Sequence, residues 1–283
     1  MLSIFIMYST DRFEALDYTI SCLKDMKLYK ESQKTLVVDG KIDKIPKNWE
    51  VVQVPRFNNK FCWAKMWDAG VLTSQNEKIV YLDSDRLLPS NFLELIYENL
   101  EDNLFLFTSF HFMMQQKISL EKCKKILNSS TEQFKEELDL SFLRYEPIQA
   151  EPFHGSGKNV MSGCTAFTRK TYLKLGGVDH WYCGHGAFAD SDFHMQAASA
   201  GCEFVDLQIP QIHFIHKKLD NNQNSLKDKD LWLLSLENFI YYCQKWKLPM
   251  ALAESMAVRC DIKNPHSYIS KKLKQIMADA KEC

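Results

Sequence analysis

The segment IVYLDSD, residues 79–85, decides the fold that we predict for this chain. Its first four residues are apolar and indicate a buried strand, and two carboxylates follow where the chain leaves that strand. Carboxylates at positions i and i+2 can both reach one divalent cation, and Mg²⁺ and Mn²⁺ prefer oxygen ligands of this kind. A turn and helix cap before Pro89 would explain the same residues about as well.

Strand-like and helix-like patterns alternate around this segment. Apolar runs predict further strands at residues 2–8, 35–38 and 51–54. Helical spacing predicts helices at residues 12–26, 61–72 and 89–100. The alternation predicts βαβ units in an α/β fold with a mainly parallel central sheet flanked by helices. Ligands of such sheets bind at the carboxyl ends of the strands, where Asp39, Asp83 and Asp85 stand.

The second half of the chain gives weaker patterns. Strands are expected at residues 104–112, 203–207 and 212–215, polar helices at 119–138 and a loop at 144–161. Residues 217–229 are polar and predict a linker or lid, and two or three helices follow over residues 230–281. We expect the aromatic residues of the first of these helices to pack against the preceding domain: Trp232, Phe239, Tyr241, Tyr242 and Trp246.

Composition narrows the class of protein. The chain has 283 residues, with 35 lysines and arginines against 36 aspartates and glutamates, and this balance argues against a nucleic-acid binder. Its nine cysteines include no C-x-x-C pair, which argues against a structural zinc site. The first residues lack the pattern of a signal peptide. We therefore expect a cytoplasmic protein, with peripheral contact to the inner membrane face as an alternative.

Further acidic residues and histidines have two interpretations each. Asp190 and Asp192 precede a helical stretch, where carboxylates suit a helix N-terminus, but one of them would also serve as a general base. His213 and His216 fall on opposite faces of an extended strand, so they would not share a metal unless the chain turns. One of them would still complete the ligand set of the aspartate pair.

In this order the motifs resemble those of GT-A-fold, nucleotide-sugar-dependent glycosyltransferases, specifically glycosyltransferase family 2 and the β-1,4-galactosyltransferase-like enzymes. The motifs are STDR (9–12), VVDG (37–40), FCWAKMWDAG (61–70), YLDSDRLLP (81–89), GCTAF (163–167), GGVD (176–179), GAFADSDF (186–193) and IHFIHKK (212–218). The resemblance covers residues 1–218 and implies a Rossmann-like catalytic domain there. Residues 1–100 would form its nucleotide-sugar half and 101–218 its acceptor half, with a helical C-terminal extension at 219–283.

The resemblance also implies the roles of individual residues. Donor binding is expected of Ser9, Arg12, Asp39, Lys65, Asp68, Asp83, Ser84 and Asp85. Mn²⁺ or Mg²⁺ would be held by Asp83, Asp85 and His216, with His213 as the alternative ligand. Asp190 would be the catalytic base, and the acceptor side would include Gly163, Trp181, Tyr182, His185 and Asp192. The aromatic residues among these would equally well fill a core.

The function that follows is metal-dependent transfer of a sugar, from a UDP-sugar in the first instance, to a hydroxyl of a glycan or lipid-linked glycan. Single displacement would invert the anomeric centre, and retention is the alternative. The sequence departs from the family pattern at Ala189, where a glutamate is expected, and at Gln196, where an arginine is common. Ala189 gives weight to a non-catalytic module of the same fold that binds a nucleotide-sugar or a glycan.

Two further interpretations concern the ends of the chain. A nucleotidyltransferase is disfavoured because the first turn, residues 9–16, contains no glycine. Several lysines follow late in the last predicted helix: Lys271, Lys272, Lys274 and Lys281. We expect them to form a solvated face, and contact with an anionic membrane is the alternative.

Overall fold

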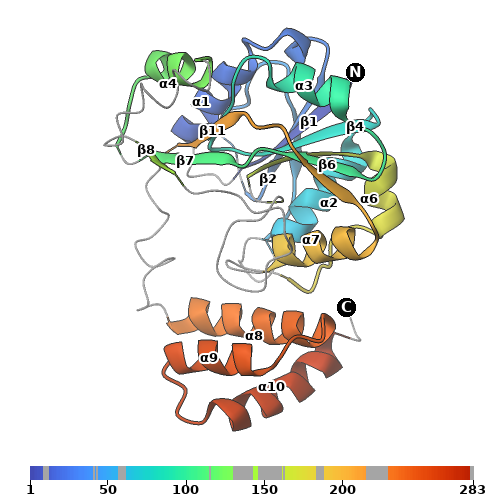
Figure 1. Ribbon diagram of the computed structural model, residues 1–283, viewed down its shortest axis with the longest axis vertical. Coiled ribbons are helices and arrows are strands. Elements are labelled where there is room, and N and C mark those ends of the chain that lie inside the picture. The colour runs from blue at the N-terminus through green and yellow to red at the C-terminus, as the bar shows by residue number, and fades with distance from the viewer. Residues whose placement is uncertain are drawn as a thin grey trace.

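The computed structural model of the chain describes residues 1–8, 13–40, 42, 44–56, 62–114, 116–129, 143–145, 161, 163–182, 188–214 and 229–280. Its central sheet has seven strands: β1 (Leu2–Tyr8), β2 (Gln33–Val38), β3 (Glu50–Gln53), β4 (Lys78–Asp83), β6 (Leu104–Phe107), β9 (Cys164–Thr168) and β10 (Glu203–Asp206). They lie in the order β10-β6-β9-β4-β1-β2-β3 (Figure 1). All neighbouring pairs are parallel except those of β9, which is antiparallel to both β4 and β6. The predicted α/β class and mainly parallel sheet are confirmed.

Helices cover both faces of this sheet because its central strands are apolar on both faces. In β1, Ile4 and Ile6 belong to one buried cluster, whereas Phe5 and Met7 belong to the other. The first cluster is closed by α1 (Phe13–Leu23) and α3 (Phe92–Asn99), with a short 3₁₀ helix, η1 (Lys27–Tyr29), beside them. The second is closed by α2 (Trp63–Thr73), α6 (Arg169–Leu175) and α7 (Ala189–Ser199).

Helix α2 lies very close to the sheet. A Cβ atom on Gly70 would stand 2.3 Å from the ring of Phe5, so only glycine fits at this crossing. The fully buried Trp67 packs on the same ring, with centroids 5.8 Å apart, and on Tyr81 of β4 at 4.1 Å. These contacts fix α2 against the strand that carries the aspartate pair.

A smaller second sheet has four strands: β5 (Arg86–Leu87), β7 (Phe110–Met114), β8 (Leu143–Tyr145) and β11 (Pro210–His213). Their order is β5-β11-β7-β8, and α4 (Leu120–Leu127) packs beside them. The single strand predicted over residues 104–112 is therefore wrong, because the chain passes from β6 in one sheet to β7 in the other. Asp206 holds this crossing: its carboxylate accepts a hydrogen bond from the backbone N–H of Ser109 at 3.0 Å.

The antiparallel strand β9 was not predicted. All five of its residues, CTAFT, are buried, because it lies between β4 and β6 with helices over both faces. Its two threonines, Thr165 and Thr168, interrupt and end the apolar run that would indicate a strand. The buried Thr165 satisfies its hydroxyl by donating to the backbone oxygen of Leu106 at 3.1 Å.

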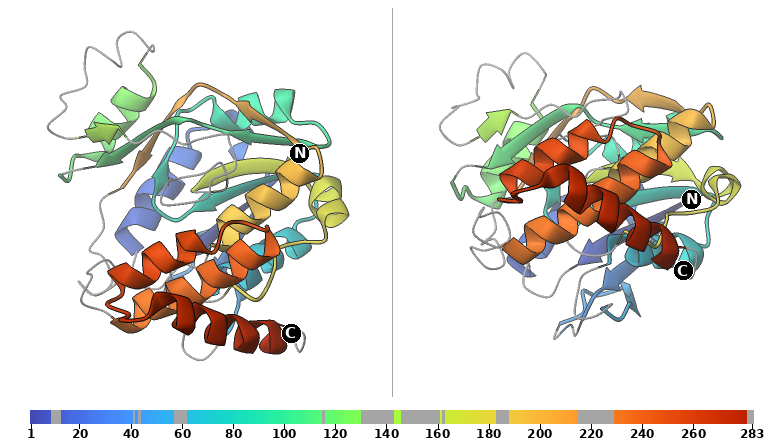
Figure 2. Two further views of the ribbon diagram at one scale, coloured as in Figure 1. Left: turned by 60° about the horizontal axis from the view of Figure 1, so that its bottom comes forward. Right: turned by 90° about the horizontal axis from the view of Figure 1, so that it is seen from below.

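Three C-terminal helices follow, α8 (Lys229–Lys245), α9 (Ala251–Arg259) and α10 (Pro265–Asp279), and they pack on one another (Figure 2). Their buried residues belong to the same cluster as those of α2 and α7, so the bundle continues the core below the sheet. Phe239 and Tyr242 are buried in it and pack on Phe188, and Tyr241 and Trp246 pack against the same cluster, which confirms the packing predicted for these four residues. The side chain of Trp232 lies outside the described residues.

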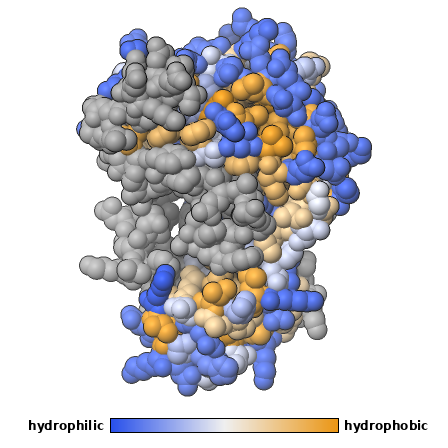
Figure 3. Space-filling view, in the orientation of Figure 1, coloured by the Kyte–Doolittle hydropathy of each residue, from blue (hydrophilic) through white to orange (hydrophobic). Residues whose placement is uncertain are grey.

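Among the described residues, no helix is both long enough and apolar enough to cross a bilayer. The face in Figure 3 mixes hydrophilic residues along its outline with hydrophobic ones over the sheet domain and the helical bundle.

Candidate functional site

The D-S-D turn joins the two sheets. Asp83 is the last residue of β4, and Arg86 begins β5, which pairs antiparallel with β11 and so sets Arg86 opposite His213. Helix α1 holds the turn in place, because the hydroxyl of Thr19 donates a buried hydrogen bond to the backbone oxygen of Ser84 at 3.0 Å. The pairing of β5 with β11 therefore brings His213 next to the aspartate pair, although the histidine lies far from both aspartates in the sequence.

Asp85 is the buried member of the pair. Its side chain is 1% exposed, and its Oδ2 lies 3.2 Å from Nε2 of His213. The backbone oxygen of Asp85 also accepts a hydrogen bond from the N–H of Phe214 at 2.8 Å. The histidine that the sequence analysis kept as the alternative ligand thus contacts one of the predicted metal ligands, whereas His216 lies outside the described residues.

Asp83 is the exposed member, with 28% of its side chain accessible. It accepts a short hydrogen bond from the Tyr81 hydroxyl. Burial, and then the charge of Asp83, raises the pKa of Tyr81 well above its ordinary value, so this hydroxyl stays a donor. The Asp83 carboxylate is therefore oriented by the protein and still open to a ligand.

Arg86 supplies a positive charge to both aspartates and was not predicted. Its side chain is 5% exposed, with Nη2 3.4 Å from Oδ2 of Asp83 and Nε 3.5 Å from Oδ1 of Asp85. Its Nη1 lies 2.5 Å from Nε2 of the buried His111 on β7. Gly163 makes room for it, since a Cβ there would stand 2.3 Å from the guanidinium carbon.

Gly163, predicted on the acceptor side, lies at the start of β9 beside the D-S-D turn. Its φ is +87°, in the left-handed region, and its carbonyl accepts the N–H of Asp83 at 2.8 Å. Both features suit glycine, because a side chain would strain the backbone and displace the arginine.

The aspartates and the histidine fit a divalent cation by their chemistry, since carboxylate oxygens and imidazole nitrogen are ligands that Mn²⁺ accepts. Among the described residues, no group of three or more histidine, cysteine, aspartate and glutamate side chains is arranged to hold a metal. The described residues therefore offer the carboxylates of Asp83 and Asp85 as ligands, and His213 contacts Asp85 without forming with the two aspartates a group of three arranged around a metal.

Asp39 lies just beyond β2, on the same side of the sheet as the end of β4. It is 3% exposed and forms an ion pair with Arg56, whose Nε and Nη2 each lie 2.8 Å from Oδ2. Its Oδ1 is buried and accepts no hydrogen bond from the part of the chain that the structure describes. A buried carboxylate oxygen of this kind suits a donor group on a ligand. The other residues predicted near it, Ser9 and Arg12, lie outside the described residues.

Lys65 and Asp68 are both on α2, and both are half-buried. Asp68 reaches both α6 and the segment that follows it: it accepts a short hydrogen bond from the hydroxyl of Tyr172 in α6, and its Oδ2 lies 2.5 Å from Nε2 of His180. Burial and the Asp68 charge raise the pKa of Tyr172. Asp68 therefore links the predicted donor half to the predicted acceptor half.

Asp190 lies in the first turn of α7. The helix begins after Phe188, which has a left-handed φ of +57°, and the backbone N–H of Ser191 donates to Asp190 Oδ1 at 2.8 Å. Asp190 is half-buried, whereas the adjacent Ala189 is 2% exposed and belongs to the core. The position where the family pattern has a glutamate is thus a core position in this protein.

Asp192, in the same turn, is completely buried. Its Oδ1 accepts hydrogen bonds from the Tyr182 hydroxyl at 3.1 Å and from Nε1 of Trp246 at 2.7 Å, and its Oδ2 lies 2.7 Å from Nζ of Lys245. Burial raises the pKa of Asp192, although Lys245 and Trp246 act to lower it. Tyr182 is fully buried as well, and His185 lies outside the described residues.

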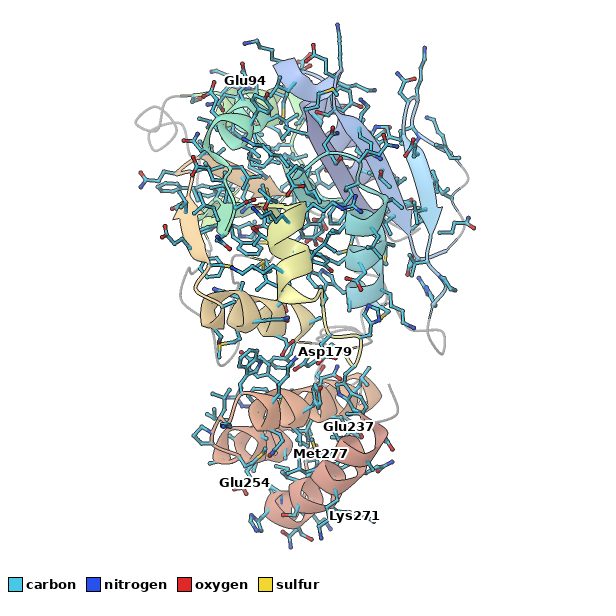
Figure 4. All side chains as sticks on the ribbon, turned by 90° about the vertical axis from the view of Figure 1, so that its right-hand side faces the viewer. Glu94, Asp179, Glu237, Glu254, Lys271 and Met277 are labelled. Carbon is cyan, nitrogen blue, oxygen red and sulfur yellow. The ribbon has the colours of Figure 1, made fainter. Side chains whose placement is uncertain are left out.

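Asp179 shares the same lysine. Its Oδ2 lies 2.8 Å from Nζ of Lys245 and accepts the Tyr241 hydroxyl at 3.0 Å, and its Oδ1 accepts the N–H of Trp181. Burial acts to raise the pKa of Asp179, but these hydrogen bonds and the lysine charge outweigh it and lower the pKa. Figure 4 shows Asp179 where the sheet domain meets the C-terminal helices.

No protein-family model and no curated protein matches this sequence. Solved structures match it in fold. S. aureus TarS 1-349 in complex with UDP-GlcNAc is 10% identical over 99% of this chain and 80% of that chain, with a TM-score of 0.56. GalNAc-T7 with UDP, GalNAc and Mn²⁺ is 10% identical over 86% of this chain but only 47% of that one, with a TM-score of 0.56.

A third match is mannosyltransferase PcManGT from Pyrobaculum calidifontis, in complex with GDP-Man and Mn²⁺. It is 12% identical over 100% of this chain and 75% of that chain, with a TM-score of 0.50. At such identities the likeness concerns the fold alone. It confirms the predicted GT-A fold.

Proposed function

We propose that this protein is a metal-dependent glycosyltransferase that moves a sugar from a nucleotide-sugar to a hydroxyl of a glycan or lipid-linked glycan. The observation that carries the proposal is the D-S-D turn at the end of β4, with His213 beside Asp85, in a GT-A fold. The matched structures that contain UDP-GlcNAc, UDP or GDP-Man support a nucleotide-sugar donor. The choice of UDP, the closer likeness to family 2 and a cytoplasmic location rest on the sequence alone.

The donor would lie across the carboxyl ends of β2 and β4. Asp39 would accept a hydrogen bond from the nucleoside through its buried Oδ1, with Arg56 holding the other oxygen. Asp83 and Asp85 would hold a divalent cation, with His213 or His216 as a further ligand. When bound, such a cation offsets the negative charge of a departing diphosphate.

Asp190 would accept the proton of the acceptor hydroxyl as that oxygen attacks the anomeric carbon. Its place in the first turn of α7 and its half-buried side chain support this role, because the carboxylate is held in position and yet accessible. Attack from the face opposite the leaving nucleotide would invert the sugar, and retention remains the alternative outcome.

A variant of Asp190 tests the proposal. Purified protein is incubated with Mn²⁺, a panel of UDP- and GDP-sugars and an array of glycan acceptors, and both glycan products and free nucleotide are measured. Asp190→Asn should lower transfer by about 10²- to 10⁴-fold, as expected for loss of a general base, and leave nucleotide affinity unchanged. Asp17→Asn, on an exposed position of α1, is the matched control.

One observation favours a second candidate, a non-catalytic module that binds a nucleotide-sugar or a glycan. Ala189 occupies the glutamate position of the family pattern and is buried in the core, so no acidic side chain is available there. Nucleotide binding without turnover of any donor, in wild type and Asp190→Asn alike, would favour this candidate over the enzyme.

A further inference from the structure

The last turn of α8 reaches into the predicted acceptor half of the sheet domain. Lys245 bridges two carboxylates, with Nζ 2.8 Å from Oδ2 of Asp179 and 2.7 Å from Oδ2 of Asp192. The adjacent Trp246 donates its indole N–H to Asp192, and Tyr241 donates its hydroxyl to Asp179. Three side chains from the C-terminal bundle therefore bind two carboxylates that precede or begin α7.

Burial makes these contacts necessary rather than incidental. The Asp192 side chain is 0% exposed and that of Lys245 is 29% exposed, so the pair is largely screened from water. A buried carboxylate without partners is strongly unfavourable. Of the three side-chain donors that the described residues supply to Asp192, Lys245 is the last residue of α8 and Trp246 follows it directly. The sheet domain alone leaves Asp192 with the Tyr182 hydroxyl only, among the hydrogen bonds of the described residues.

Aromatic rings surround the lysine and limit its movement. Nζ lies 5.8 Å from the ring centroid of Tyr182, 6.0 Å from that of Tyr241 and 5.8 Å from that of Trp246. Tyr241 in turn packs on the ring of Trp181, with centroids 5.2 Å apart. Cation–π attraction and packing thus hold the ammonium group at one place between the two aspartates.

The consequence concerns Asp190, which lies two residues before Asp192 in the same helical turn. Fixing the Asp192 carboxylate fixes the N-terminal turn of α7, and that turn sets where the Asp190 carboxylate is presented. We propose that Lys245 and Trp246 are positioning residues for Asp190, so that the C-terminal bundle is an integral part of the acceptor side of the site. This inference rests on the proposed function for the role of Asp190, but the contact with α7 is testable without it.

Two variants separate positioning from general stability. Lys245→Met removes the charge and keeps most of the length of the side chain, whereas Trp246→Phe removes the indole N–H that donates to Asp192 and keeps a smaller aromatic ring. Lys272→Met is the matched control, because Lys272 also pairs with α8, through Glu237 at 2.6 Å, but lies away from Asp192. Lys245→Arg retains the charge and should restore part of what Lys245→Met loses.

The first readout is amide hydrogen exchange of residues 189–199. We expect faster exchange there in Lys245→Met and Trp246→Phe than in wild type and Lys272→Met, while β1 and β4 stay equally protected in all four proteins. Equal exchange of α7 in Lys245→Met and Lys272→Met would overturn the inference. So would faster exchange spread evenly over the whole chain, because that is the effect of general destabilisation.

The second readout is kinetic, with the donor and acceptor found for the wild type. We expect kcat to fall by about 100-fold in Lys245→Met, with the KM for the donor nearly unchanged, because a displacement of about 1 Å at a catalytic group has an effect of that size. An unchanged kcat in the folded variant would overturn the inference. If the wild type binds no nucleotide, the proposed function fails, and the exchange of α7 still decides whether Lys245 and Trp246 hold this helix.

Discussion

Replacing Arg86 by methionine tests whether its guanidinium offsets the negative charge of the two aspartates of the D-S-D turn when no cation is bound. The guanidinium contacts both carboxylates, at 3.4 Å from Asp83 and 3.5 Å from Asp85, and is itself 5% exposed. Methionine is unbranched and approximates the volume of the arginine side chain, so the change removes the charge and the donors and keeps much of the packing.

The magnitude follows from burial. Breaking a buried ion pair by removing one partner destabilises a protein by about 3–5 kcal/mol. Asp83 is 28% exposed, and Asp85 keeps His213 at 3.2 Å, so part of the lost interaction is replaced by water and by the imidazole. We therefore expect the lower end of that range, about 3 kcal/mol in the free energy of unfolding.

A divalent cation should reverse this loss. Urea unfolding at neutral pH, followed by tryptophan fluorescence, is measured in EDTA and at increasing Mn²⁺. A cation that binds only the folded state stabilises it by about 2.7 kcal/mol at a concentration about 100 times its Kd. The half-saturating Mn²⁺ concentration should be lower for Arg86→Met than for wild type, because the guanidinium no longer repels the cation.

The control is Lys170→Met, which breaks an ion pair with Asp102 whose lysine side chain is 73% exposed. It should change stability by less than about 1 kcal/mol at every Mn²⁺ concentration. Equal stability of Arg86→Met and wild type in EDTA would show that the guanidinium does not stabilise the two carboxylates. Equal stabilisation of the two by Mn²⁺ would refute the placement of the cation beside Arg86.

Three further predictions concern other parts of the site. Gly163→Ala should displace the buried arginine and strain a left-handed residue, and so lower the free energy of unfolding by about 1–2 kcal/mol; thermal unfolding checks this, and unchanged stability contradicts it. Asp39→Asn should weaken UDP binding about tenfold or more, the effect of losing a hydrogen bond to a charged group, measured by calorimetry. The stability difference between wild type and Lys245→Met should be full near pH 7 and shrink as pH falls. Protonation of Asp192, whose pKa is raised, begins this loss, and protonation of Asp179, whose pKa is lowered, completes it at a lower pH. Urea unfolding of both proteins over a range of pH checks this prediction, and a stability difference that grows as the pH falls would contradict it.

Strands were predicted correctly where one apolar run forms one buried strand. The runs 2–8 and 79–82 are apolar because β1 and β4 are buried on both faces, and the pattern alone indicated this. It failed for residues 104–112, where two strands of different sheets follow one another with only Thr108 and Ser109 between them. The break depends on Asp206, almost a hundred residues later, which binds the backbone of Ser109.

Some residues of the candidate site could likewise be predicted from the sequence, and others could not. The aspartates at strand ends were predicted from topology, because parallel strands carry their carboxyl ends to one edge of the sheet. Arg86 was not assigned a role, although it follows Asp85 directly, because its contacts depend on the pairing of β5 with β11 and on the space over Gly163. Lys245 gave no local signal, since its partners lie 53 and 66 residues away along the chain.

Calorimetric titration of UDP shows whether a metal-dependent nucleotide-sugar site lies at the end of β4. The titration is made with Mn²⁺ and again in EDTA, on wild type, on Asp85→Ala and on the Lys170→Met control. We expect UDP to bind to wild type and to the control with Mn²⁺, and not to bind in EDTA or to Asp85→Ala. UDP binding to the wild type that is as tight in EDTA as with Mn²⁺, or binding to Asp85→Ala that is as tight as to the wild type, would contradict a metal-dependent site at the end of β4. So would a wild type that binds neither UDP nor GDP with Mn²⁺.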